Sequence, residues 1–183
     1  MATVLILRAP DELWFVPFSS ATGEGAVALP VAPGEFERLG EWLTTARVGA
    51  VTSVLDVNDA PIASVHVSPR GVRVHATVNG EVKRAVVRNA HLAVMLMRLF
   101  DARRLKAQFL PCGSVVIDDR TFTPAELDGL ADALVGPHAG FVTKEVRHAA
   151  LSDAENARQV RVLARVARWY AAWERDAARV RGE

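Results

Sequence analysis

The chain has few of the features that would assign it to a specialised class of protein. Its 183 residues include one cysteine, Cys112, which excludes an internal disulfide framework and fits a reducing compartment. No apolar run approaches the ~18 residues that span a bilayer, and no cationic segment precedes the apolar N-terminal run as in a signal peptide. We therefore expect a cytoplasmic protein with no membrane partner, in which Cys112 is a buried structural thiol.

Patterns typical of catalysis and metal binding are also scarce. The histidines show no His-Xaa-Xaa-Xaa-His spacing and no cysteine pair accompanies them, so we expect no metal site. His66 and His75 fall on neighbouring predicted strands and could meet, but a structural role is expected for them. Cys112 and the Asp118-Asp119 pair are the residual candidates for an enzyme, but Asp118-Asp119-Arg120 is typical of a hairpin turn. The sequence thus predicts a non-enzymatic protein with no catalytic residue and no cofactor.

What the chain does have is abundant apolar sequence and an uneven distribution of charge. Half of the residues are hydrophobic, which is enough for a large core. Residues 1–60 carry three Lys/Arg against eight Asp/Glu, whereas residues 61–112 carry nine Lys/Arg against two Asp/Glu. Such asymmetry predicts either an anionic partner or an acidic first third that packs against the basic middle. Both alternatives remain open at this point.

The best-defined structural unit is a predicted antiparallel β-meander at about residues 51–88. Three turn signals divide four β-rich runs, at Asn58–Pro61, Ser68–Gly71 and Asn79-Gly80. A two-residue Asn79-Gly80 loop pairs His75 with Arg84 and sets Lys83 beside Ala76, whereas a one-residue bulge would realign the two strands. The sequence does not distinguish between these registers.

Helices and short strands are predicted on both sides of the meander. A strand pair (3–8 and 13–18), a loop (19–25) and a strand (26–31) precede a helix that starts at Gly34 and stops at Gly49. After the meander, Asn89 caps a helix that is apolar on nearly all sides and therefore buried. A strand at 114–117 follows, and capping boxes at Thr123 and Ser152 open two further helices.

These elements predict an α+β fold with helices packed against the meander. We expect residues 1–150 to form a compact α+β domain, which can also be divided into two similar strands-then-helix halves at 1–49 and 50–110. Residues 151–183 form a long C-terminal helix that serves in packing or oligomerisation.

The C-terminal helix carries a row of cations. At about 100° per residue, Arg158, Arg161, Arg165, Arg168, Arg175 and Arg179 occupy one sector roughly 100° wide. About two-thirds of the circumference is apolar, and the sector beside the arginines contains Val162, Val166, Trp169 and Trp173. We therefore expect this helix to pack on two surfaces, one of which could be a second copy of the chain.

The predicted function is sequence-independent binding of a nucleic-acid backbone by a homo-oligomer. Guanidinium groups favour phosphate, and the meander lacks the aromatic side chains on which bases stack. The alternative is an adaptor subunit of a phage or bacterial protein assembly, in which Val162, Val166, Trp169 and Trp173 dock a partner. The arginine row could instead be a solvated face that pairs in part with Glu155, Glu174, Asp176 or the acidic first third of the chain. The residues proposed to bind DNA or RNA are Arg70, Arg73, Lys83, Arg84, Arg88, Arg158, Arg161, Arg165, Arg168 and Arg175.

Overall fold

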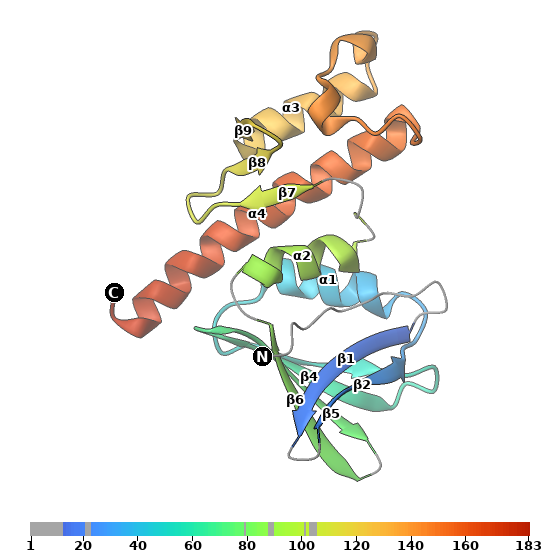
Figure 1. Cartoon of the computed structure of the whole chain (residues 1–183), viewed down its shortest axis with the longest axis vertical. Coiled ribbons are helices and arrows are strands. Elements are labelled where there is room, and N and C mark those ends of the chain that lie inside the picture. The colour runs from blue at the N-terminus through green and yellow to red at the C-terminus, as the bar shows by residue number, and fades with distance from the viewer. Residues whose placement is uncertain (1–12, 21–22, 79, 88–89, 101, 103–105) are drawn as a thin grey trace. The chain divides into compact units, whose positions relative to one another are not determined.

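The structure, a computed structural model, shows an α+β protein as the sequence predicts (Figure 1). It describes residues 13–20, 23–78, 80–87, 90–100, 102 and 106–183. The chain divides into two compact units, of which the first takes in the described residues of Met1–Asp101 together with Asp176–Glu183, and the second is Ala102–Arg175. None of the described helices combines the length and the apolar character needed to cross a membrane.

The first unit begins with a β-hairpin. Strands β1 (Leu13–Ser20) and β2 (Gly23–Pro30) pair along their whole length, so that Ser20 lies opposite Gly23. The expectation of a loop over 19–25 is therefore wrong, because the ladder continues into this polar segment. The strand expected at 3–8 lies outside the described residues.

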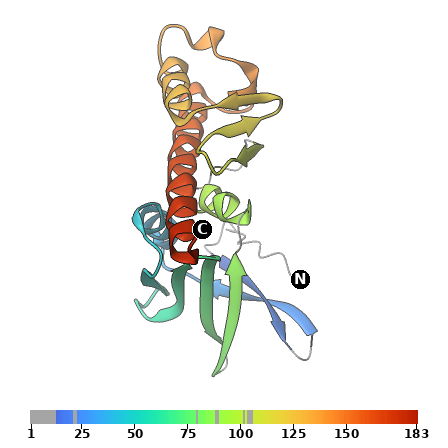
Figure 2. The same ribbon diagram turned by 90° about the vertical axis from the view of Figure 1, so that its left-hand side faces the viewer.

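The predicted meander is confirmed as a four-stranded antiparallel sheet. Its strands β3 (Val51–Leu55), β4 (Pro61–Ser68), β5 (Gly71–Val78) and β6 (Glu81–Val87) lie in chain order. Val78 pairs with Glu81, so the two-residue loop and not the bulge sets the register of β5 and β6. Gly80 has a φ of 80°, the left-handed conformation that such a turn requires. Strand β1 lies next to β6 (Figures 1 and 2).

Two helices cover one face of this sheet. Helices α1 (Glu35–Thr45) and α2 (Ala90–Leu99) lie on the same side of the strands (Figure 2). α1 ends at Thr45, so the prediction that it stops at Gly49 is wrong; with a φ of 96°, Gly49 lies in the turn that leads into β3. The cap expected at Asn89 lies outside the described residues. The core between helices and sheet includes Phe36, Leu39, Leu43, Val65, Val72, Val74, Leu92, Leu96 and Leu99, all buried.

A buried carboxylate joins α1 to the sheet. Glu35 is 6% exposed, pairs with Arg38 one turn later, and accepts a hydrogen bond of 2.9 Å from the backbone N–H of Leu55. Arg38 in turn donates to the backbone oxygen of Ser53. Burial alone would raise the pKa of Glu35, but the hydrogen bonds from Arg38 and Leu55 outweigh it and leave the pKa lowered.

The second unit contains a small sheet, two short 3₁₀-helices, one α-helix and most of a second, longer α-helix. Strands β7 (Ala107–Phe109), β8 (Val115–Ile117) and β9 (Arg120–Phe122) form an antiparallel sheet. The strand predicted at 114–117 and the turn at Asp118 are confirmed, whereas β7 was not foreseen. The helical elements are α3 (Pro124–Leu134), the short η1 (Ala139–Phe141) and η2 (Lys144–Val146), and α4 (Asp153–Arg181), whose residues up to Arg175 belong to this unit.

The two predicted capping boxes differ in outcome. At Thr123 the side chain accepts from the N–H of Glu126 and the Glu126 carboxylate accepts from the N–H of Thr123, so the box is complete. At Ser152 only half of it forms. The Ser152 hydroxyl accepts from the N–H of Glu155, but the Glu155 carboxylate accepts from Arg158 and Gln159 instead.

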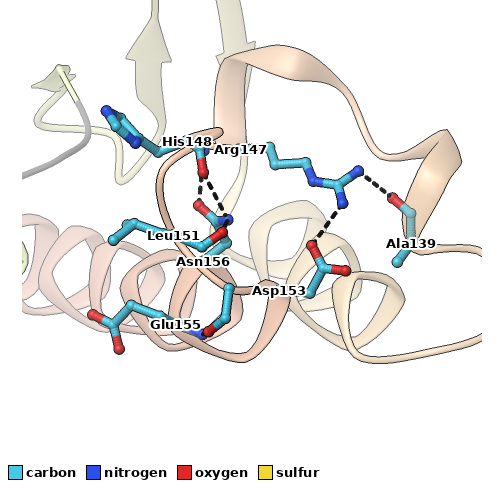
Figure 3. Close-up of polar contacts among 8 residues, drawn as sticks. Ala139, Arg147, His148, Leu151, Asp153, Glu155 and Asn156 are labelled. Carbon is cyan, nitrogen blue, oxygen red and sulfur yellow. Dashed lines mark hydrogen bonds and ion pairs between the residues drawn. The ribbon is translucent and has the colours of Figure 1, made fainter.

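A buried amide holds the segment that precedes α4. Asn156 is 2% exposed; its Oδ1 accepts from the N–H of His148 at 2.8 Å, and its Nδ2 donates to the carbonyls of His148 and Leu151 (Figure 3). Arg147 bridges the same region by donating to the carbonyl of Ala139 and the carboxylate of Asp153. The turn into α4 is thus fixed by side chains that replace missing backbone partners.

Cys112 is exposed, so the expectation of a buried thiol is wrong. It lies in the β7–β8 connection, where Gly113 has a φ of 94°. Hydrogen bonds with the backbone and hydroxyl of Ser114 lower the pKa of the thiol. The Pro-Cys-Gly sequence makes a surface turn, and a turn at the surface leaves its central side chain in solvent.

Candidate nucleic-acid interface

The sheet of the first unit has a second face, opposite to the one that α1 and α2 cover. Side chains alternate along each strand, so the residues out of phase with the buried valines share this face. Apart from Ser68 and Gly71 at the strand ends, they are exposed or half-exposed, and none is Asp or Glu. We call the exposed and half-exposed residues of β3 to β6 in this phase the outer face: Val51, Ser53, Ile62, Ser64, His66, Arg73, His75, Thr77, Val82, Arg84 and Val86.

The register arranges the outer face in two rows that cross the strands. Val51, His66, Arg73 and Val86 form one row, and Ser53, Ser64, His75 and Arg84 form the other. The rows lie about 7 Å apart, and neighbours within a row lie about 5 Å apart. Each row therefore sets one arginine beside one histidine. We call these four residues the basic cluster: His66, Arg73, His75 and Arg84.

The two arginines of the basic cluster have no carboxylate partner in the part of the chain that the structure describes. Both side chains are exposed. The adjoining strands offer no acid on this face, because β3 and β5 contain no Asp or Glu and the single acid of β6, Glu81, lies out of phase with Arg84. Arg73 and Arg84 thus present guanidinium N–H groups to solvent, where a phosphate oxygen can accept hydrogen bonds from them.

The two imidazoles of the cluster lie in contact with each other. The ring centroids of His66 and His75 are 4.8 Å apart, with the planes tilted by 40°. His66 Nε2 is 2.9 Å from the hydroxyl of Ser64, a residue directly beside His75 in the second row. Partial burial lowers the pKa of His75 first, and the charges of His66, Arg84 and Arg73 lower it further.

The other predicted sheet cations lie apart from this cluster. Lys83 occupies the opposite phase of β6, beside Ala76, and forms an ion pair of 2.6 Å with Glu81. Arg70 is exposed in the turn between β4 and β5, where its backbone N–H donates to the Ser68 hydroxyl. Arg88 lies outside the described residues. Of the sheet cations predicted to bind nucleic acid, the structure therefore brings Arg73 and Arg84 together and places Lys83 and Arg70 elsewhere.

The arginine row of α4 is largely paired with carboxylates of the same chain. Arg158 pairs with Glu155 at 2.6 Å, and Arg179 pairs with Asp176 at 2.8 Å. Arg161 and Arg168 reach the α3 residues Asp132 and Asp128, at 2.9 and 2.5 Å. Arg165 also interacts within the chain, and Arg175 is exposed without an ion pair in the described ranges. A polyanion on this row would have to displace several carboxylates.

The apolar residues proposed as a partner interface on α4 are mostly buried. Trp169 and Trp173 are each 3% exposed and stack on one another, with ring centroids 6.3 Å apart. Val166 is fully buried, and Val162 is half-exposed. Tyr170 stacks on Trp173 as well, and burial followed by a hydrogen bond to Glu174 raises the pKa of Tyr170 to about 12.

No known protein family, curated protein or solved structure matches this chain. Within the described ranges, no three His, Cys, Asp or Glu side chains gather closely enough to hold a metal ion. On chemical grounds the outer face is the strongest candidate site, because it gathers two imidazoles, several hydroxyl groups and two arginines that have no acidic partner among the described residues. Sequence reasoning included its arginines but not its histidines, although the same strand register places all four together.

Proposed function

We propose that the protein binds the phosphate backbone of nucleic acid, without preference for sequence, through the outer face of the β3–β6 sheet. The observation that carries the proposal is a sheet face whose fixed charges, among the residues that the structure describes, are two arginines without acidic partners. Guanidinium–phosphate contacts supply affinity but no base discrimination. The serine and threonine hydroxyls on the same face can donate to further phosphate oxygens.

The residue composition of the face favours the backbone over the bases as the part that is bound. The outer face has no Phe, Tyr or Trp, so it lacks the usual platforms for stacking. Two arginines give a weak site on their own. Self-association of the chain, which remains part of the proposal, would present several such faces to one polyanion and raise the apparent affinity.

The test compares two double variants that remove the same charge from different surfaces. Arg73→Gln with Arg84→Gln changes the outer face, and Arg161→Gln with Arg168→Gln changes α4. We would titrate each protein into labelled single-stranded and double-stranded DNA at about 50 and about 200 mM salt and follow fluorescence anisotropy.

The outer-face variant is expected to bind more weakly than the α4 variant at low salt. With single-stranded DNA, the slope of log K against log salt should become shallower by about 1.4, because each lost phosphate contact removes about 0.7. Equal losses in both variants would show a response to net charge alone, and a larger loss on α4 would assign the site to the arginine row. Absence of binding by the unchanged protein at about 50 mM salt refutes the proposal.

The adaptor-subunit alternative has one supporting observation. Phe141 in η1 is 87% exposed, and Val135, just after α3, is 55% exposed. Large apolar side chains that gather at the surface are common sites of protein contact. Light scattering of the unchanged protein and of Phe141→Ser tests this alternative and self-association together. If Phe141→Ser leaves the assembly mass unchanged, docking through η1 is not supported.

A further inference from the structure

We propose that the imidazole pair makes the outer face proton-sensitive: when the face binds a phosphate backbone, the His66–His75 pair takes up a proton, so that binding strengthens as the pH falls. This inference rests on the proposed function and adds its regulation by pH. It starts from the contact between the rings, whose centroids lie 4.8 Å apart.

The fixed charges that surround the pair on the described strands are cationic. His75 on β5 is flanked by His66 of β4 and by Arg84 of β6, with Arg73 on its own strand. β3 contributes no ionisable residue next to His66, and β1, which lies beside β6, contains none between Leu13 and Ser20. These strands therefore supply no carboxylate that would compensate a positive charge on either ring.

This arrangement disfavours protonation of His75 in the free protein. Partial burial and then the neighbouring charges of His66, Arg84 and Arg73 lower the pKa of His75, so its ring is mainly neutral near neutral pH. A phosphodiester that lies over the arginines adds negative charge beside the same ring. The bound anion therefore favours the protonated form, and proton uptake and anion binding stabilise each other.

A divalent metal ion is a less suitable ligand for the same two rings. Two imidazoles alone give an incomplete coordination set, and the guanidinium groups on both sides repel a cation. The shared chemistry of the cluster is that of an oxyanion site, with donors from arginine, protonated imidazole and serine.

The sign of the effect follows from the direction of the pKa shift. The pKa of His75 is lower in the free protein than in the complex, so the extra affinity is absent at pH values above both. It develops as the pH falls through the pKa of the complex and is complete below that of the free protein. Uptake of one proton raises the affinity by up to about tenfold per pH unit within this window.

The experiment measures binding of an oligothymidylate without terminal phosphates, about 20 nucleotides long, between about pH 8 and about pH 5.5 at constant salt. The phosphodiesters keep their charge across this range. The proteins are the unchanged chain, the double variant His66→Gln with His75→Gln, and the control His138→Gln, an exposed histidine of the second unit.

We expect the affinity of the unchanged chain and of His138→Gln to rise by about tenfold over this range, and that of the double variant to stay nearly constant. In addition, the NMR titration midpoint of His75 should move upward when the oligonucleotide is present. A double variant with the same pH dependence as the unchanged chain, or a His75 midpoint that does not move, overturns the inference.

The two proposals fail in different ways. If the unchanged chain binds DNA equally well at both ends of the pH range, the outer face can still be the binding site and only the proton linkage is wrong. If no protein binds at any pH at low salt, the proposed function itself is wrong. Circular dichroism of the double variant establishes that it is folded, and the NMR midpoint needs no substitution.

Discussion

Substitution of Asn156 by alanine should destabilise the second unit by about 3 kcal/mol. In the structure this amide is 2% exposed and serves three backbone groups through its two polar atoms. The carbonyl of His148 keeps a second partner, because the N–H of Leu151 also donates to it at 3.0 Å. The N–H of His148 and the carbonyl of Leu151 lose the Asn156 amide (Figure 3).

The magnitude follows from these two groups. A buried polar group without a partner costs about 1–3 kcal/mol, so two such groups give about 3 kcal/mol after partial access of water. Urea denaturation followed by circular dichroism measures the loss. Amide hydrogen exchange of His148 gives a local readout, because its N–H donates to Asn156 Oδ1.

Asn156→Asp is the matched control. It keeps an acceptor for the N–H of His148 but no donor for the carbonyl of Leu151. We therefore expect slow exchange of the His148 amide in the aspartate variant and fast exchange in the alanine variant. A loss below about 1 kcal/mol in Asn156→Ala, with unchanged exchange at His148, refutes the reasoning that this amide fixes the turn.

Three further predictions concern stability. Leu163→Ala, at a fully buried position of α4, should cost about 3 kcal/mol in urea denaturation; a cost under about 1 kcal/mol contradicts the assigned core. Thr123→Ala removes the cap of α3 and should cost about 1 kcal/mol, whereas Thr123→Ser should cost much less. Because the pKa of Glu35 is lowered in the folded chain, its stabilising effect is present above the ordinary value of 4.5 and lost as the pH falls through the folded pKa. The difference in unfolding free energy between the unchanged chain and Glu35→Gln should therefore shrink on acidification, and a constant difference contradicts it.

The proposed site illustrates how charge counts and charge placement differ. The sequence has a basic middle segment, but the described cations of that segment do not act alike: Lys83 is paired on one phase of β6, and Arg84 is unpaired on the other. A one-residue change of strand register would exchange these positions. The composition of the segment is the same in both cases, so only the register decides which cation can meet an anion.

For the arginine row of α4, the sequence predicts the arrangement of the side chains but not their pairing. Its periodicity could be worked out from the sequence, since the helical repeat is a local property of the backbone. Its availability could not, because the carboxylates that pair with Arg161 and Arg168 come from α3, about thirty to forty residues earlier in the chain. Contacts between distant segments have no local signature.

Local chemistry explains what the sequence by itself determined. Turn residues such as Asn79-Gly80, the complete capping box at Thr123 and the alternation of valines are sufficient to specify the meander, the α+β class and the start of α3. These features depend on φ/ψ preferences and hydrogen bonds within a few residues. Where the local signals were weak, as at the 19–25 segment and Gly49, the predicted boundaries were wrong.

Only the tertiary structure decided which polar groups are paired, buried or exposed. It set His66 against His75, exposed Cys112, and left Arg73 and Arg84 without an acidic partner in the described part of the chain. The physical reason is that electrostatic energies and desolvation depend on distances between groups that are far apart along the chain. Those distances follow from the packing of the whole unit.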